Sequence, residues 1–294
     1  NFYLVYCPER AVEGSALREL CLLPQVIGGI DNNSINQAAK IFKKITKKIV
    51  ITSNIETAEM IKYAANAFLA LKISYINEVA NLCEAVGADV HLVAKAMGQD
   101  GRISPKFLHP GPGFGGSCFP KDTHAIAALS RKKGVPMNTI DAAIITNNDQ
   151  KKRMTQKLKN LVGGDFSNKT FGVLGLAFKP NTDDVRESSS IEMIQSIMDG
   201  GGEVRAYDPI ANESMKEIFP DLNYCDSWEE TCEDVDAMAI MTDWNEFRGM
   251  SLEKLKKIMK APIVLDTRNI LSIDKLSEHG FQFDNVGRKK YYDS

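Results

Sequence analysis

The chain has 294 residues, of which 44% are hydrophobic and 25% are charged, and its formal net charge is -2 at pH 7. This length predicts about two domains, and this composition is typical of globular proteins. The charge excludes a nucleic-acid binder held by phosphate contacts, and the lack of a long apolar run excludes a membrane span.

The cysteines and histidines predict neither a disulfide framework nor a metal site. Six cysteines are widely spaced without a CxxC pair, and four histidines are scattered along the chain. This usage favours a reducing, cytoplasmic compartment.

Residues 1–53 alternate between strands and helices, which predicts part of a parallel α/β layer. The expected elements are strands at 2–7, 26–29 and 48–52, a loop with a short helix at 8–22, and a helix at 36–45. Three strands make a poor core alone, and a chain seldom opens on a core strand. We therefore interpret this region as the C-terminal remnant of a larger domain whose upstream residues are not included.

Residues 54–164 are predicted to be mostly helical. Apolar residues recur at helical spacing over 56–85, a length of about 45 Å at 1.5 Å per residue. A long and largely apolar helix must bury more than one face, so it is expected to be a spine between domains or a dimer interface. Further helices are expected at 90–97, 121–133 and 137–160.

Residues 165–294 form a βαβ series after a junction at Gly163-Gly164-Asp165. This series predicts a doubly wound parallel sheet with ligands at the C-terminal ends of its strands. The expected strands are 169–174, 203–207, 237–241, 263–266 and 282–286, with helices between them, the first at 189–200.

The segment Gly111–Thr123 is the most informative stretch of the chain. Its glycines allow another molecule to approach the backbone, and Ser117 or Asp122 is a candidate cap for the helix that follows. Cys118 would lie at the start of that helix with Lys121 beside it, and both features favour the thiolate. The segment predicts covalent chemistry on a bound substrate.

A glycine turn follows the strand at 169–174, but Gly172–Ala177 is not a full GxGxxG. A dinucleotide site and a plain tight turn are equally compatible with it. Lys179, two residues later, is a candidate phosphate partner or part of a solvated loop.

Other polar residues allow both a functional and an ordinary interpretation. Lys62 and Asn66 project from one face of the long helix. They are either part of a functional site or polar residues on a face exposed to solvent. Glu9 and Glu13 follow the first strand, and they are either ligand contacts or ordinary acidic residues of a loop. Arg102 and Arg268 lie in loops, as anion contacts or surface charges.

Taken together, these segments resemble the UDP-glucose/GDP-mannose dehydrogenase family, in the same order and from the first residue to about Arg288. Cys7–Arg10 departs from the branch that oxidises UDP-glucose and resembles the acetamido-sugar branch, whereas the cysteine loop is similar to that of the UDP-glucose branch. The matching segments are Pro8-Glu9, Glu13–Ala16, Lys62–Leu69, Gly111–Thr123, Gly175–Lys179, Arg186–Ser190, Tyr207–Pro209 and Asp266–Arg268.

The resemblance implies an NAD-binding Rossmann domain, of which 1–53 is the remnant, a helical dimerisation domain at 54–164 and a UDP-sugar-binding domain at 165–294. The family's GxGxxG, its ribose-binding acid and a catalytic threonine would lie upstream of Asn1. The resemblance also implies a homodimer or higher homo-oligomer formed through the central helix.

The resemblance further implies four-electron oxidation of a UDP-sugar, UDP-glucose to UDP-glucuronate, with NAD. Cys118 would form a thiohemiacetal and then a thioester. Lys62 and Asn66 would stabilise oxyanions, Asp122 would orient water and Glu9 would assist proton transfer. The implied substrate contacts are Glu13, Arg102 (reaching a neighbouring subunit), Phe107, Gly115, Lys179 and Arg268, and the implied cofactor contacts are Lys121 and Arg186.

Two alternatives to this assignment remain open. One is a related dehydrogenase acting on UDP-N-acetylmannosamine or GDP-mannose. The other is a catalytically incomplete fragment that binds UDP-sugar and dimerises. The absence of the NAD motif from these 294 residues favours the second for the isolated chain.

Overall fold

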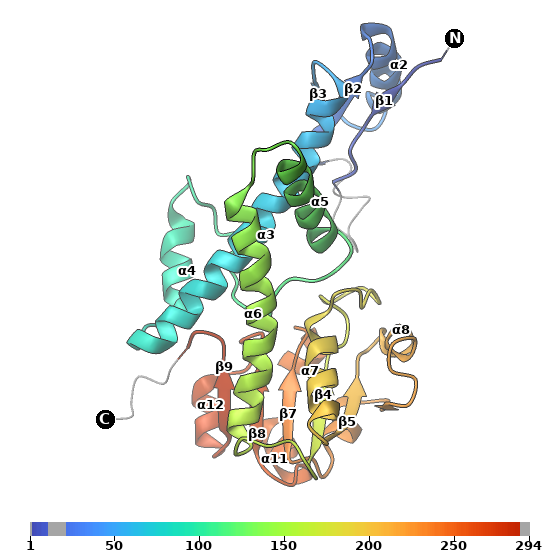
Figure 1. Cartoon of the computed structure of the whole chain (residues 1–294). Helices are drawn as coiled ribbons and strands as arrows, with labels where there is room; N and C mark the ends of the chain where they lie inside the picture. Colours follow the sequence, from blue (N-terminus) through green and yellow to red (C-terminus); the bar gives the residue numbers. More distant parts are fainter. Residues whose placement is uncertain (1, 11–21, 289–294) are drawn as a thin grey trace.

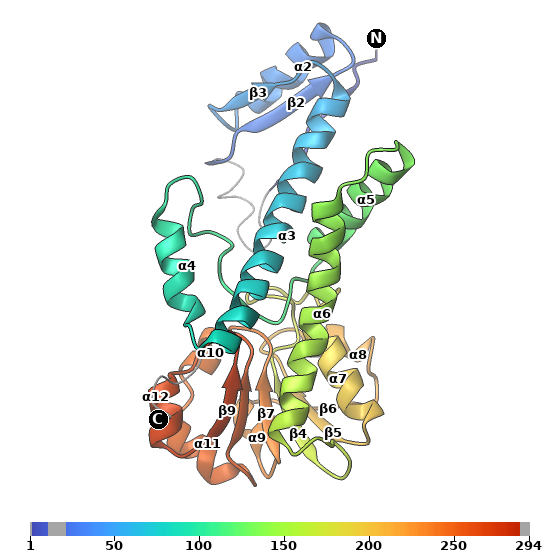
Figure 2. The same ribbon diagram turned by 60° about the vertical axis from the view of Figure 1, so that its left-hand side comes forward.

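The long helix α3 (Ile55–Val86) forms the axis of the molecule in a computed structural model that describes residues 2–10 and 22–288. A three-stranded sheet lies at one end of α3 and a six-stranded sheet at the other (Figures 1 and 2). The Asn54 side chain caps the start of the helix by accepting from Thr57 N at 2.9 Å, and Gly87 ends it at φ 76°. Its bounds agree with the predicted helix at 56–85.

The N-terminal sheet has the order β1-β2-β3, and helices α2 and α3 both pack against it. Strands β2 and β3 pair in parallel, but β1 pairs with β2 antiparallel, so the expectation of a wholly parallel layer was wrong. The first strand is also shorter than predicted, and most of the expected loop with a short helix at 8–22 lies outside the described residues. The elements are β1 (Val5–Tyr6), β2 (Gln25–Gly29), α2 (Asn32–Phe42) and β3 (Ile49–Ile51).

Three further helices build the middle of the molecule: α4 (Val90–Gln99), α5 (Phe119–Lys132) and α6 (Asn138–Leu161). Helix α3 packs against both α5 and α6, and Ala67 meets Ile126, Ala127 and Ile140 in a small core there. One line of apolar side chains on α3 is exposed, because it faces none of these elements. Its members are Met60, Phe68, Tyr75, Leu82 and Val86.

The C-terminal sheet is doubly wound and parallel throughout, in the order β6-β5-β4-β7-β8-β9, as predicted. The short strand β6 was not predicted. The chain reverses direction across the sheet between β4 and β7, which is where such sheets bind ligands. The strands are β4 (Thr170–Leu174), β5 (Glu203–Tyr207), β6 (Asn223–Tyr224), β7 (Ala237–Ile240), β8 (Ile263–Asp266) and β9 (Gln282–Asn285).

Helices cover both faces of this sheet. Helices α6 and α7 (Ser189–Asp199) pack on one face, and α9 (Trp228–Cys232) and α11 (Leu252–Ile258) on the other. Alternate residues of β7 serve the two sides, because successive strand side chains point in opposite directions. Short helices complete the unit: α8 (Asn212–Lys216), α10 (Asn245–Arg248) and α12 (Ile273–Glu278).

The helical middle and the C-terminal sheet share one hydrophobic core. Ile76 and Ala80 of α3 join Met154 and Leu158 of α6 and Phe171 of β4 in the same buried cluster. This shared core fixes the sheet relative to α3. The boundaries 1–53, 54–164 and 165–294 remain a prediction.

An ion-pair network reinforces the same junction. Glu84 of α3 accepts from Lys157 and Arg153 of α6, each at 2.8 Å, and from Gly287 N at 2.8 Å. Lys157 also contacts Asp284 of β9 at 2.9 Å.

The described part of the chain contains no helix with the length and apolar character required to cross a bilayer.

Candidate active site

Cys118 lies at the N-cap position of α5 and its side chain is exposed. Neither Ser117 nor Asp122 caps the helix, contrary to prediction: the helix has no side-chain cap, and Asp122 lies inside its first turn. Pro120 is in the first turn, where its missing N–H costs nothing. The thiol is thus at a helix N-terminus, which favours negative charge.

The glycines of the cysteine loop face the protein itself. A Cβ on Gly115 would collide with the Glu187 carbonyl, and one on Gly116 would lie 2.8 Å from the Phe178 ring. Gly116 N also donates to Arg186 O at 2.8 Å. These glycines let the segment after β4 pack closely on the loop.

Three of the expected catalytic or cofactor residues meet beside Cys118. The Asn66 side-chain amide donates to Asp122 at 2.6 Å, and Lys121 Nζ lies 3.0 Å from the other oxygen of the same carboxylate. Asp122 is fully buried, and its hydrogen bond raises the pKa of Lys121. The carboxylate therefore links helices α3 and α5.

Lys62 precedes Asn66 by one helical turn and is half-buried. Among the described residues it has neither a hydrogen bond nor an ion pair. Glu9 is exposed after β1. Glu13 lies outside the described residues.

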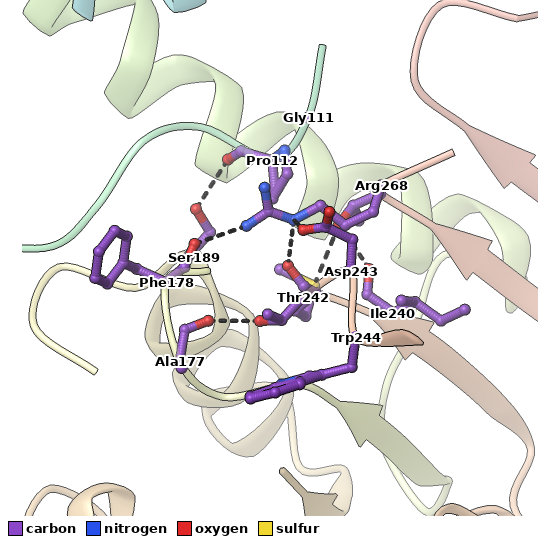
Figure 3. Close-up of polar contacts among 12 residues, drawn as sticks. Gly111, Pro112, Ala177, Phe178, Ser189, Ile240, Thr242, Asp243, Trp244 and Arg268 are labelled. Carbon is purple, nitrogen blue, oxygen red and sulfur yellow. Dashed lines mark hydrogen bonds and ion pairs between the residues drawn. The ribbon is translucent and has the colours of Figure 1, made fainter. Parts of the chain in front are cut away.

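Arg268, after β8, is held in a fixed orientation (Figure 3). Its Nε donates to Met241 O at 2.7 Å and its Nη2 to Phe178 O at 2.9 Å, while Asp243 lies at 4.0 Å. Burial lowers the pKa of Arg268 below its usual value. The position of a Cβ on Gly111 is 3.6 Å from Nη1, so this arginine borders the start of the cysteine loop.

The glycine turn after β4 is a tight turn that holds an internal anion. Asp208 Oδ2 accepts from Leu176 N at 2.8 Å and from Ala177 N at 3.1 Å, and also from Trp244 Nε1 at 3.0 Å. Gly175 has φ +91° and packs against Thr242, leaving no room for a side chain. A dinucleotide phosphate would need the N–H groups that Asp208 occupies, so the tight-turn interpretation holds here.

A polar hollow of about 300 Å³ opens at the carboxyl ends of β4, β5 and β7. It lies at the reversal point of the sheet, near Arg268, whose neighbour Asp243 lines it. The lining comprises Pro180, Asn181, Pro209, Asp243, Trp244, Asn245, Glu246 and Arg248.

The remaining expected residues lie around the loop. Lys179 Nζ is 5.3 Å from the centre of the Phe178 ring. Arg186 pairs with Asp184 at 2.8 Å, and this bond lowers the pKa of Asp184. The Phe107 ring packs edge-on against Phe119, with centroids 6.0 Å apart.

Arg102 is separate from the other site residues. Its side chain is 90% exposed and pairs with Asp100 in its own turn at 2.6 Å. Nothing among the described residues connects it to Cys118. This exposure agrees with the expectation that it serves a neighbouring subunit, which stays a prediction.

Sequence reasoning missed three side-chain amides that hold the loop. Asn147 bonds both backbone groups of Phe114, Gln150 donates to Gly111 O at 2.8 Å, and Asn77 accepts from Gly111 N at 2.8 Å. Asn77 lies on α3 and is fully buried. The missed signal was the helical spacing that places Asn147 and Gln150 among the buried apolar residues Ala143 and Met154 of α6.

The described residues contain no cluster of histidine, cysteine, aspartate and glutamate able to hold a metal ion. Lys121 and Arg186, the expected NAD contacts, both lie by the cysteine loop, and their role toward NAD stays a prediction. The described residues do not supply a free phosphate cradle at the β4 turn, because Asp208 occupies it.

Two family profiles match the chain. Residues 56–149 match the central domain of the UDP-glucose/GDP-mannose dehydrogenase family, and residues 172–273 match its UDP binding domain.

Curated relatives support the same assignment over nearly the whole chain. A UDP-glucose 6-dehydrogenase of Rickettsia bellii is 39% identical, covering 98% of this chain and 68% of the relative. UDP-glucose 6-dehydrogenase TuaD of Bacillus subtilis is 42% identical, covering 98% and 62%. One from Rhizobium meliloti is 39% identical, covering 96% and 65%, so the chain spans about two thirds of these relatives' length.

Solved structures share the fold. A UDP-glucose dehydrogenase from Pyrobaculum islandicum superposes with a TM-score of 0.89 at 33% identity, covering 98% of this chain and 64% of that one. A UDP-D-ManNAc dehydrogenase from Pyrococcus horikoshii gives 0.85 at 30% identity, covering 98% and 65%.

Proposed function

The chain belongs to the UDP-glucose/GDP-mannose dehydrogenase family, and from this premise we propose that it carries the nucleotide-sugar and acyl-transfer half of a UDP-glucose 6-dehydrogenase. The observation that carries the proposal is Cys118, exposed at the start of α5 with the Asn66–Asp122–Lys121 cluster one helical turn away. UDP-glucose is the proposed substrate because three similar proteins are named UDP-glucose 6-dehydrogenase.

In this proposal Arg268 and Lys179 hold the diphosphate at the edge of the C-terminal sheet. Arg268 is suited to this role because two backbone carbonyls fix its plane, so little entropy is lost when an anion binds. Phe107 and Gly115 line the path from this edge to Cys118. Arg102 and Glu13 would complete the contacts, Arg102 in a neighbouring subunit.

The covalent step takes place at Cys118. Its thiolate adds to the C6 aldehyde of the sugar, forming a C–S bond while the carbonyl electrons move to oxygen. Lys62, without a partner among the described residues, supplies a positive charge for that oxygen, and Asn66 is held beside it. Asp122 orients the water that later releases the acid, and Glu9 assists proton transfer.

NAD, when bound, accepts the hydrides removed from the sugar. On this chain Lys121 and Arg186 are the proposed contacts to it. The relatives are dehydrogenases, which supports a redox cofactor for the family's reaction.

We also propose pairing with a second copy through α3. Phe68, Tyr75 and Leu82 repeat at seven-residue spacing and remain exposed on one line of the helix. Such a line buries well against a symmetric copy.

A cytoplasmic location is proposed from the five described cysteines, all of which are free.

The covalent role is tested without NAD by using the 6-aldehyde of UDP-glucose. We expect this aldehyde to protect Cys118 from iodoacetamide, measured by peptide mass mapping, whereas UDP alone protects it less. Cys118→Ser should show no adduct. Labelling of Cys118 that is unaffected by the aldehyde would contradict the proposal.

One observation favours a second candidate, a chain that binds UDP-sugar and dimerises without turnover: Asp208 fills the β4 turn, the glycine turn where a dinucleotide phosphate was considered. The 294-residue chain would then bind UDP by calorimetry and produce no NADH from UDP-glucose and NAD. Measurable NADH formation would exclude this candidate. UDP-N-acetylmannosamine and GDP-mannose, used as competing ligands, identify the sugar.

A further inference from the structure

Asn147 of α6 is buried and uses both ends of its side-chain amide on one loop residue. Phe114 N donates to its Oδ1 at 2.7 Å, and its Nδ2 donates to Phe114 O at 3.0 Å. A backbone N–H and C=O in a buried loop both need partners. A single side chain satisfies both here, much as a neighbouring strand would.

The loop is shaped to admit this contact. Gly113 has φ +113°, and a Cβ there would lie 2.9 Å from Asn147 Oδ1. Gln150, one turn further along α6, holds the Gly111 carbonyl. The loop is therefore attached to α6 at two points, Gly111 and Phe114. Phe114, which Asn147 holds, is the one closer in sequence to Cys118.

Phe114 connects this attachment to the start of α5. Its ring packs edge-on against Phe119, with centroids 6.1 Å apart, and Phe119 directly follows Cys118. Pro112 O accepts from Ser189 Oγ at 3.0 Å, which holds the loop from the opposite side. A shift of Phe114 would thus be transmitted to the first turn of α5.

We propose that Asn147 is a positioning residue: by fixing the backbone of Phe114 it holds the segment that leads into Cys118, and so sets where the thiol lies at the N-terminus of α5. The proposal rests on the proposed function, in which Cys118 is the nucleophile. Asn147 itself touches neither substrate nor thiol in this role; it acts through the backbone of Phe114.

The test compares Asn147→Leu and Asn147→Ser with Asn148→Ser, an exposed neighbour of the same type on the same helix. The rate of iodoacetamide reaction at Cys118 is followed by peptide mass mapping from about pH 6 to about pH 10. We expect both Asn147 variants to react about fivefold more slowly than the parent near neutral pH and to converge with it at high pH, since helix-end stabilisation of the thiolate is of this order. Asn148→Ser should match the parent.

Thermal unfolding of each variant shows whether it is folded. If Asn147→Leu does not fold, Asn147→Ser carries the same expectation, because it buries no apolar group beside the Phe114 backbone. A folded Asn147 variant with the parent's pH profile would overturn the proposal, as would an equal change in Asn148→Ser. Aldehyde protection of the parent chain is measured alongside: its failure contradicts the proposed function and leaves the alkylation comparison valid.

Discussion

The amide of Asn66 donates a 2.6 Å hydrogen bond to the carboxylate of Asp122, joining the central helix to the helix that begins after Cys118. Asp122 is fully buried, so Asn66 supplies one of its carboxylate oxygens with a donor, while the other oxygen lies 3.0 Å from Lys121 Nζ. One contact therefore has a structural and a proposed catalytic role, whereas Lys62, one turn earlier, has no partner among the described residues.

This contrast predicts different outcomes at the two positions. Asn66→Ala should lower the free energy of unfolding by about 1–3 kcal/mol, because Asp122 loses a buried donor. Lys62→Met should change it by less than about 0.5 kcal/mol, as expected for a side chain with neither a hydrogen bond nor an ion pair among the described residues. Urea unfolding measures both values.

Lys62→Met should nevertheless prevent the 6-aldehyde of UDP-glucose from protecting Cys118, because the oxyanion loses its positive charge. Lys62→Arg, which keeps the charge, is the matched control. Full protection in the folded Lys62→Met protein would show that Lys62 plays no part in the addition.

Arg268→Lys should weaken UDP binding by about tenfold or more, because lysine lacks the planar fork that Met241 O and Phe178 O hold in place. Isothermal titration calorimetry with UDP measures the change. Arg131→Lys is the control, since Arg131 lies in the last turn of α5, pairs with Asp141 and does not line the polar hollow. Equal affinity in Arg268→Lys and the parent would remove Arg268 from the diphosphate site.

The Glu84 network predicts a pH-dependent contribution to stability. Burial opposes ionisation of Glu84, but hydrogen bonds from Lys157, Gly287 and Arg153 outweigh it and lower its pKa below the ordinary 4.5. The contribution is therefore present above pH 4.5 and is lost as the pH falls through the lowered pKa.

Glu84→Gln should thus cost about 1–3 kcal/mol of unfolding free energy at neutral pH, and this cost should shrink as the solution is acidified below the ordinary pKa. Denaturant titrations at several pH values measure the difference. Glu78→Gln, an exposed change on the same helix, should have little effect. A cost for Glu84→Gln that stays constant down to about pH 3 would contradict the assignment to ionisation.

Most of the regular structure followed from residue patterns. Periodic apolar residues marked α3, and the strands at 203–207 and 263–266 were placed at their observed bounds. The antiparallel β1 was missed because strand direction depends on the partner strand, and β6 because two residues carry no detectable period.

The candidate site divides in the same way. Cys118, Lys62 and Asn66 stand out by residue type and spacing. Asn147 and Gln150 do not, because their role depends on a loop more than 30 residues away in sequence. The occupation of the β4 turn by Asp208 also depends on a tertiary contact, from the end of the neighbouring strand.

The Asp208 contact has a consequence for ligand choice. Asp208 is part of the same chain as the turn, so its carboxylate is present there at a very high effective concentration. It therefore competes with any phosphate for the same N–H groups, and its negative charge also repels a phosphate. The N–H groups of the turn after β4 are therefore not available to bind an external anion. An anionic ligand of this sheet is directed instead toward the neighbouring strand end, where Arg268 provides a positive charge whose geometry is already set.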